Sequence, residues 1–498
     1  MFDELKKLLK QSSIYGVGAV ISPLISFIML PIYTRFLTPE DYGVLALTNV
    51  VTLTMTAVVG LGIRSGIMRI YYTYSEKKDR DSVIITSLFF SFAVSILFSL
   101  TLHIFSPYIA PRLFNVKECY YILDLVSYSI VFSILGGNLL AVLRTEEKSK
   151  AYIFVTTTSL VLTMLLNIFF VVVLKRKVAG VLEAGLIATF VIAVGNAIYT
   201  IRDKKLSLSF SKLKEVLGFG IPLVPALIAD ITLSLSDRYF LEHYTSLSDV
   251  GLYSLGYRIA AMLSILVTKP FNMAWPPYMF KTAEKKNAPE IYKNVLVYYL
   301  FVAAWVGSLL SLFSREALMI VATSAYYGAY KIVPIIVVSY ILVGIEQIMV
   351  AGLHITKKTK YAGLLFIITA AINLLFNFLL IPGLGMMGAA LSTIISYIFL
   401  DSMYLVVSQK FYPINHDFGR IFKIFFAFTL VSAGTYMNFF GSGIVLPIVF
   451  KALLGFSFPL ILLLIGFFRR EEIAKLKQIL SIVIVPVFNS LSIRRNRL

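Results

Sequence analysis

The stretch DRYFLEHYTSLSDVGLYSL, residues 237–255, decides the fold because the chain carries a similar stretch about two hundred residues earlier. That earlier stretch is TRFLTPEDYGVLAL, residues 34–47, and it aligns Arg35 with Arg238. Such a match between distant segments indicates an internal duplication. After a short insertion the alignment also pairs Asp41 with Asp249 and Gly43 with Gly251.

Two further segment pairs occur in the same order along the chain. RTEEKSKAY (144–152) resembles HITKKTKYA (354–362), and GVLEAGLIATF (180–190) resembles GMMGAALSTII (385–395). If each unit contains six helices, both units start on the same side of a membrane and form parallel repeats about an axis along the membrane normal. The predicted architecture is therefore two lobes around a central cavity, with residues 1–205 as the N-lobe, 206–410 as the C-lobe, and two extra helices and a basic cytoplasmic tail in 411–498.

The composition requires a membrane protein. Hydrophobic residues make up 58% of the 498 positions and charged residues only 14%, with a mean hydropathy of +0.85. A soluble domain does not approach these values, and continuous apolar runs exclude a β-barrel. The fold class is all-α polytopic, with about 14 transmembrane helices. The expected spans are 12–34, 42–63, 82–106, 120–143, 151–174, 178–200, 216–237, 250–274, 293–313, 331–353, 361–381, 385–407, 420–440 and 443–467.

The positive charge is placed as in a membrane protein rather than a nucleic-acid binder. The net charge is +19, and 33 of the 45 Lys and Arg residues fall on the N-terminal segment, alternate loops and tail, against 9 on the opposite side. This asymmetry follows the positive-inside rule and predicts that both termini are cytoplasmic. Nucleic acid is not an expected partner.

Span 250–274 carries the first candidate substrate-binding residues. Arg258 and Lys269 are eleven residues apart, about 20° of net rotation on an α-helix, so both should share one face, with Asn272 close to it. One interpretation is a water-filled cationic cavity. The alternative is structural: Lys269 extends to the interface, and Asp230, at a similar depth, neutralises Arg258.

Three further cavity candidates lie at the ends or on the faces of spans. Asn49 begins a polar face of span 42–63, and Arg64 lies near its inner end. Arg35, the repeat partner of Arg238, stands at the outer end of the first span, where an interface anchor is the alternative role.

Intramembrane carboxylates form a second group of candidates. Asp230 and Asp237 are seven residues apart on one polar stripe, and Glu346 lies in span 331–353. Buried charge is costly in a bilayer, so it needs a partner, water or a function. Ion coupling and ion pairing are both open. Pro23, Pro222 and Pro225 interrupt the first helix of each lobe and are candidate hinges, although static bundles also contain proline kinks.

Enzymatic function is not expected. The chain has no phosphate-binding glycine–lysine loop, HExxH or GxSxG motif, and its short loops leave no room for a catalytic domain. The single Cys119 and four histidines exclude a cysteine metal cluster and a disulfide framework. No metal or cofactor is predicted.

Several motifs together resemble one family. PIYTRFLTPEDYGVLAL, SDRYFLEHYTSLSDVGLYSLGYRIA and NLLFNFLLIPGLGMMGAALSTIISY look like the Wzx-type oligosaccharide flippases of the multidrug/oligosaccharidyl-lipid/polysaccharide exporter superfamily. The resemblance covers twelve spans and implies alternating access in the bacterial cytoplasmic (inner) membrane. The implied cargo is an undecaprenyl-diphosphate-linked oligosaccharide for surface polysaccharide assembly, and membrane lipids, a polysaccharide polymerase and chain-length proteins are implied partners.

Three alternatives stay open at this point. A lipid II flippase shares the architecture and differs in cargo, and a multidrug exporter of the same superfamily should have an acidic cavity. A scaffold for glycan synthesis would move no lipid. Since no ATP site is present, net transport needs a proton or sodium gradient, the membrane potential, or consumption of the product outside.

Overall fold

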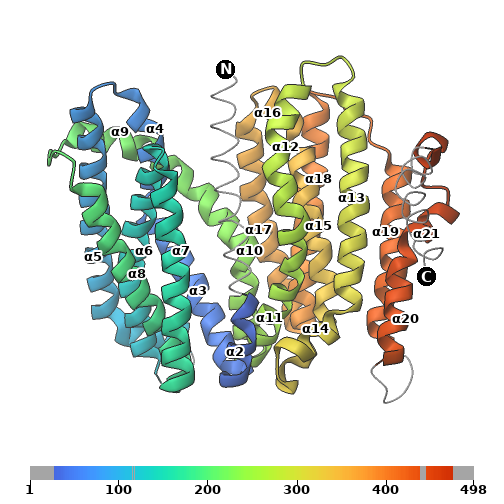
Figure 1. Cartoon of the computed structure of the whole chain (residues 1–498), viewed down its shortest axis with the longest axis horizontal. Coiled ribbons are helices and arrows are strands. Elements are labelled where there is room, and N and C mark those ends of the chain that lie inside the picture. The colour runs from blue at the N-terminus through green and yellow to red at the C-terminus, as the bar shows by residue number, and fades with distance from the viewer. Residues whose placement is uncertain (1–26, 115, 117, 438–444, 475–498) are drawn as a thin grey trace, which may run out of the picture.

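The computed structural model is an all-α bundle, and it describes residues 27–114, 116, 118–437 and 445–474 (Figure 1). These described ranges contain no β-strand. Within them, 13 helices are long and apolar enough to cross a membrane. The first of the fourteen predicted spans, 12–34, lies mostly outside the described residues, as does the predicted hinge Pro23.

The first group of helices forms the half of the bundle drawn in blue to green in Figure 1, which we call the N-half. The elements of the N-half are α2 (Leu30–Phe36), α3 (Pro39–Val59), α4 (Ile63–Ile70), η1 (Tyr71–Thr73), α5 (Lys77–Leu113), α6 (Cys119–Thr145), α7 (Ser149–Asn167), η2 (Ile168–Val173) and α8 (Lys177–Ile201). Helix α6 packs between α5 and α8, whereas α3 packs mainly on α11 (Leu247–Leu263) and α10 (Val224–Tyr244) of the other half.

The C-half lies beside it and contains most of the largest apolar core. Its elements are α9 (Phe210–Gly220), η3 (Ile221–Leu223), α10 (Val224–Tyr244), α11 (Leu247–Leu263), η4 (Ser264–Thr268), α12 (Lys269–Thr282), α13 (Ala288–Leu312), α14 (Ser314–Val321), η5 (Ser324–Ile332), α15 (Val333–Met349), α16 (Ala351–Ile355), α17 (Thr359–Leu384) and α18 (Met386–Gln409).

The last elements flank the C-half at one edge of the molecule (Figure 1). Arg420 holds the carboxylate of Glu472 through contacts of 3.0 and 3.1 Å, and the Lys451 ammonium lies 2.6 Å from Glu316 of α14. These ion pairs tie the appended helices to each other and to the C-half. The elements are α19 (Phe418–Ser432), η6 (Ala433–Tyr436), α20 (Val445–Phe456) and α21 (Phe458–Leu464).

The two ends of the bundle are named here after the orientation that the charge pattern predicts. The inner end carries α4 and the start of α9, and the outer end carries α2 and α14 (Figure 1). The local structure at the outer end is consistent with the predicted duplication. At the start of α3, Thr38 and Asp41 exchange hydrogen bonds of 3.2 and 3.0 Å between side chains and backbone. At the start of α11, Ser246 accepts from the Asp249 backbone N–H at 3.1 Å and donates to its carboxylate.

The halves touch at the outer end through two glycines that the sequence alignment pairs. A Cβ on Gly43 would lie 2.0 Å from the Leu247 carbonyl oxygen, and one on Gly251 would lie 1.9 Å from the Pro39 carbonyl oxygen. The two contacts are reciprocal, as expected where equivalent surfaces meet across a twofold axis. Only glycine allows α3 and α11 to approach this closely.

Helix α9 joins the halves at the inner end. It packs against α4 and α5 of the N-half and then continues through η3 into α10 of the C-half (Figure 1). The anchor is apolar, because Val216 is buried in one cluster with Ile63 and Ile67. Pro222 and Pro225, the predicted hinges, stand in η3 and at the start of α10. Proline is tolerated at a first helical turn, where no backbone donor is lost.

The helix that carries Arg258 is not a continuous α-helix. It runs as α11, the π-helical segment η4 and then α12. A π-helical turn adds one residue to the ladder, which rotates the side chains of α12 by roughly 100° relative to an uninterrupted α-helix. Lys269 begins α12, directly after this turn, so the predicted common face with Arg258 is wrong.

Candidate functional site

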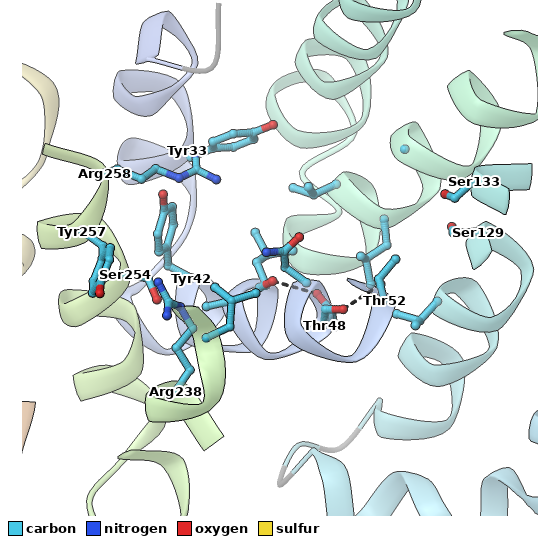
Figure 2. Close-up of a pocket in the computed structure, with 18 of the residues that line it drawn as sticks. Tyr33, Tyr42, Thr48, Thr52, Ser129, Ser133, Arg238, Ser254, Tyr257 and Arg258 are labelled. Atoms are coloured by element: carbon cyan, nitrogen blue, oxygen red, sulfur yellow. Dashed lines mark hydrogen bonds between the residues drawn. The ribbon is translucent and has the colours of Figure 1, made fainter. Parts of the chain in front are cut away.

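A cavity of about 500 Å³ lies between the halves toward the outer end, and we call it the outer chamber (Figure 2). The N-half contributes hydroxyl and amide groups from α3 and α6, including Thr48, Asn49 and Ser133. The C-half contributes two guanidinium groups, Arg238 from α10 and Arg258 from α11. The chamber is therefore cationic on one wall and neutral and polar on the other.

Arg258 is the exposed cation of this chamber. Its guanidinium carbon lies 5.5 Å from the ring centroid of Tyr42, and Figure 2 shows the side chain reaching past that ring toward Tyr33. No ion pair joins Arg258 to Asp230 in the described part of the chain, so the predicted neutralisation is not found. A guanidinium held on an aromatic face keeps its hydrogen-bond donors available for a ligand.

Arg238, in contrast, is neutralised within the protein. It is 7% exposed, and its Nη1 donates to the carboxylate of Asp237 at 2.7 Å and to the Ser234 carbonyl at 3.0 Å. The Tyr253 hydroxyl donates to the other carboxylate oxygen. The sequence gives only the approximate depth of each charge in the membrane. Asp237 and Arg238 lie at similar depths, and so do Asp230 and Arg258, so depth alone could not show which pair forms.

A second cavity of about 640 Å³, the inner chamber, lies toward the inner end. It is lined mainly by α4, α6, α7 and α8, and Met273 of α12 closes it from the C-half. Its cations are Arg64 and Arg144, and Tyr152, Thr156 and Asn196 add hydroxyl and amide groups.

Gly137 makes room for the Arg64 side chain. A Cβ on Gly137 would lie 1.9 Å from the Arg64 Nη2 atom, so any larger residue displaces the guanidinium. Ser133 and Thr189 line both chambers, which therefore adjoin. The result is a polar path with exposed guanidinium groups at two depths.

The C-half contains carboxylates that have no cationic partner among the described residues. Glu346 on α15 lies within electrostatic range of Asp230 on α10 and of Asp401 on α18. Asp401 is 7% exposed, and neither of its carboxylate oxygens has a hydrogen-bond partner in the described part of the chain. Sequence reasoning missed Asp401, although a lone acid inside the apolar span 385–407 is a signal that could have found it.

A smaller pocket of about 180 Å³ lies between the outer chamber and these carboxylates. Arg238, Tyr257 and Tyr340 line both the outer chamber and this pocket, and Tyr397 lines the pocket from α18. Tyr397 also lies within electrostatic range of Glu346 and Asp230. One layer of tyrosines therefore separates the chamber from the carboxylates.

The remaining predicted residues fall into two groups. Asn49 lines the outer chamber and Arg64 the inner one. Lys269, Asn272 and Arg35 line neither chamber. Lys269 and Arg35 are exposed, while the Asn272 side-chain oxygen is buried without a partner among the described residues. The structure therefore brings together only part of the predicted cationic set.

Residues 8–283 match the model of a family described as "Polysaccharide biosynthesis protein". The chain is also 25% identical over 312 residues to the Lsg locus putative protein 1 of Haemophilus influenzae, covering 59% of this chain and 72% of that protein. An uncharacterized membrane protein of Haemophilus influenzae is 24% identical over 283 residues, covering 55% of this chain and 65% of its own length.

Solved structures share the fold at low identity. The lipid II flippase MurJ in its inward closed conformation gives a TM-score of 0.72 at 16% identity, over 91% of this chain and 98% of that chain. An inward-facing multidrug resistance MATE family transporter gives 0.63 at 16%, over 78% and 94%. A transporter of the same superfamily from Pyrococcus furiosus, described with a binding pocket of reverse polarity, gives 0.55 at 14%, over 80% and 95%. The predicted all-α polytopic fold class is confirmed.

Proposed function

The chain belongs to the polysaccharide biosynthesis protein family, a family of multi-pass membrane transporters, and from that premise we propose that it flips a polyprenyl-diphosphate-linked oligosaccharide across the bacterial cytoplasmic membrane. The direction is from the inner to the outer leaflet, for surface polysaccharide assembly. The observation that carries the proposal is the pair of adjoining chambers, with Arg64 at one depth and Arg258 at another.

The chemistry of the cargo matches these chambers. A diphosphate and a chain of sugars cannot cross hydrocarbon unaided, whereas a polyprenyl tail can stay in the lipid. Arginine binds phosphate oxygens through paired, charge-assisted hydrogen bonds. The hydroxyl and amide groups on the N-half walls, such as Thr48 and Asn49, suit sugar hydroxyls. Each chamber also falls in the size range of ordinary small-molecule sites, about 300 to 1,000 Å³.

The conformation supports alternating access as the mechanism. The halves are in backbone contact at the outer end, through Gly43 and Gly251, and the inner chamber lies on the opposite side of this contact. In this state the cargo head would enter from the inner leaflet, where Arg64 and Arg144 are the cations of the inner chamber. Separation of the glycine contact would then open the Arg258 chamber to the outer side.

An ion gradient is the proposed energy source. Asp230, Glu346 and Asp401 offer carboxylates that a proton or a sodium ion would neutralise, and the buried Asp401 carboxylate has no hydrogen-bond partner in the described part of the chain. The tyrosine layer between Asp401 and Arg238 supplies the physical connection to the outer chamber. Asp237 is excluded from this role because Arg238 and Tyr253 already hold its carboxylate.

The test is flipping of a fluorescent polyprenyl-diphosphate oligosaccharide in proteoliposomes. We expect wild-type protein to move it and Arg258→Ala to reduce the initial rate at least tenfold, with Arg258→Lys intermediate because a lysine keeps the charge and loses the paired geometry. Arg112→Ala, at an exposed arginine that bonds to the Tyr108 carbonyl of its own helix, is the matched control and should keep the wild-type rate.

Two results would contradict the proposal. If wild-type protein moves lipid II or a cationic drug and none of the oligosaccharide carriers, the fold stands and the cargo is wrong. If Arg258→Ala flips at the wild-type rate, the arginine is a structural residue and the outer chamber is not the diphosphate site.

A further inference from the structure

A further cavity lies away from both chambers, on the joint between α5 and α9. Its volume is about 570 Å³, and apolar side chains dominate its lining, including Phe90, Phe210, Leu217 and Pro222. None of its residues lines the outer or the inner chamber. We call it the α9 groove, and nothing in the proposed transport cycle uses it.

The α9 groove is about as long as the acyl chain of one lipid. Its α9–η3 side runs from Phe210 to Pro222, roughly 18 Å at 1.5 Å per residue. One leaflet of the hydrocarbon core is about 15 Å thick. The groove is therefore long enough to hold one acyl chain lying along α9.

The segment that enters α9 presents apolar side chains outward. Leu206, Leu208 and Phe210 are 80, 62 and 82% exposed, respectively. These side chains are every second residue of an extended segment, so they lie on the same side of it. The segment is held on α5, because the Ser82 and Thr86 hydroxyls donate to the Ser207 carbonyl. Three such side chains beside a basic segment are typical of a membrane-surface contact rather than of a water-facing loop.

A single cation lines the groove at its inner end. Lys214 is exposed and has no ion-pair partner within the described ranges. Its neighbours are already engaged, because Lys212 pairs with Asp79 and Glu215 accepts a hydrogen bond from the Tyr74 hydroxyl. An apolar groove with one free ammonium at its headgroup end is complementary to a lipid with a negative headgroup.

We propose that the α9 groove binds one anionic phospholipid of the inner leaflet, with its acyl chain along Leu217 and Phe90 and its phosphate on Lys214. The site lies where α9, the first helix of the C-half, is held by the N-half. A bound phospholipid would therefore stabilise the inner joint between the halves. This inference does not depend on the identity of the transported cargo.

Native mass spectrometry of the delipidated full chain tests the proposal, with phosphatidylglycerol and phosphatidylcholine of identical acyl chains as probes. We expect one tightly retained phosphatidylglycerol and at least fivefold less phosphatidylcholine. Lys214→Gln should reduce phosphatidylglycerol binding at least fivefold. Gly218→Trp should do the same by placing an indole in the groove, and a Cβ at this position meets no atom within 4 Å.

Lys285→Gln is the matched control, because Lys285 is an exposed cation in the loop between α12 and α13 and lies outside the groove. It should bind phosphatidylglycerol as the wild type does. Equal retention of the two lipids, or wild-type binding by both groove variants, would overturn the proposal. Displacement of phosphatidylglycerol by one equivalent of a polyprenyl phosphate would also overturn it, since the groove would then belong to the cargo tail.

Discussion

The cavity between the halves and the interior of the C-half carry opposite charge. The chambers expose Arg64 and Arg258, and neither forms an ion pair with a described residue. The C-half interior instead holds Glu346 and Asp401, which have no cationic partner in the described ranges. Asp237 and Arg238 lie at the boundary, and there the two signs cancel.

This separation shows how one bundle can bind an anion and respond to a cation. If the carboxylates lined the chamber, they would neutralise the arginines and repel a diphosphate. Placed behind the tyrosine layer of Tyr257, Tyr340 and Tyr397, they can change charge without competing for the cargo. Three substitutions test how strictly the two regions must stay apart, and a fourth examines a pH dependence outside them.

The largest effect is expected at the boundary. Asp237→Ala leaves the Arg238 guanidinium buried without its partner, and loss of one member of a buried ion pair typically costs about 3–5 kcal/mol. Thermal unfolding in detergent should show a large fall in the midpoint temperature. Asp230→Ala on the same helix is the control, and it should change the midpoint little because Asp230 is exposed. Equal midpoints for the two variants would show that the pair contributes no stability.

The next effect concerns the carboxylates. Asp401→Asn keeps the shape of the side chain and removes its ability to exchange a cation. We expect flipping to lose its response to an imposed proton or sodium gradient, while the rate without a gradient stays unchanged. Asp203→Asn, at a carboxylate exposed at the inner end, should keep the response. A gradient response that survives in Asp401→Asn would remove this residue from the coupling role.

A smaller effect is expected in the inner chamber. Gly137→Ala places a methyl group on the Arg64 Nη2 position and should weaken binding of a polyprenyl-diphosphate oligosaccharide about tenfold, equivalent to about 1.4 kcal/mol. Gly136→Ala is a closely matched control, because its Cβ would meet only the Ala193 Cβ at 3.9 Å. If the two variants bind the lipid equally, the position of Arg64 does not matter for recognition.

The smallest effect is a pH dependence outside both regions. Burial, with a further contribution from the positive charge of Lys293, lowers the pKa of His416 to about 4. His416 precedes α19, where the appended helices leave the C-half. The unfolded chain has a histidine pKa near 6.5 and therefore binds more protons between about pH 4 and 6.5. Stability from the neutral His416 is full above that window and decreases as the pH falls through it.

His416→Gln should flatten this dependence, seen as a shift of a few degrees in unfolding midpoint between pH 7 and pH 5. His243→Gln, at an exposed histidine of α10, should keep the wild-type profile. The His416→Gln variant is also a control for the proton-gradient experiment. If transport by this variant still responds to pH, the response does not come from a pH-dependent loosening of α19. An unchanged profile in His416→Gln would show that the histidine does not titrate with folding.

The fold was largely predictable because the bilayer sets the length of each apolar segment and the duplication sets their order. The described helices confirm the all-α class, and matched caps at Thr38 and Ser246 agree with the aligned repeat. The site was less predictable. The prediction that Arg258 and Lys269 share one face assumed an ideal α-helix between them. The π-helical segment η4 interrupts that helix and rotates Lys269 away from the Arg258 face, and a hydropathy profile does not detect such a segment.

The sequence also could not determine which of the buried charges form ion pairs with each other. Sequence depth placed Asp230 level with Arg258, yet the structure pairs Asp237 with Arg238. Neighbours one residue apart on a helix point about 100° apart, so such pairing depends on local rotamers and on Tyr253 from the next helix. Asp401, in contrast, could have been identified without a structure, because it is the only acidic residue in the apolar span 385–407.

The reciprocal contact of Gly43 and Gly251 has a mechanical consequence. At these glycines the two backbones meet without an intervening side chain, so the contact can act as a pivot for rotation of one half against the other. Helix α3 continues for 16 residues from Gly43 to Val59, a lever arm of roughly 24 Å at 1.5 Å per residue. A rigid-body rotation of about 10° at such a pivot would move the inner end of α3, next to the helix that carries Arg64, by roughly 4 Å. A small tilt at the outer end is thus amplified at the inner end into a displacement comparable to the width of a sugar ring.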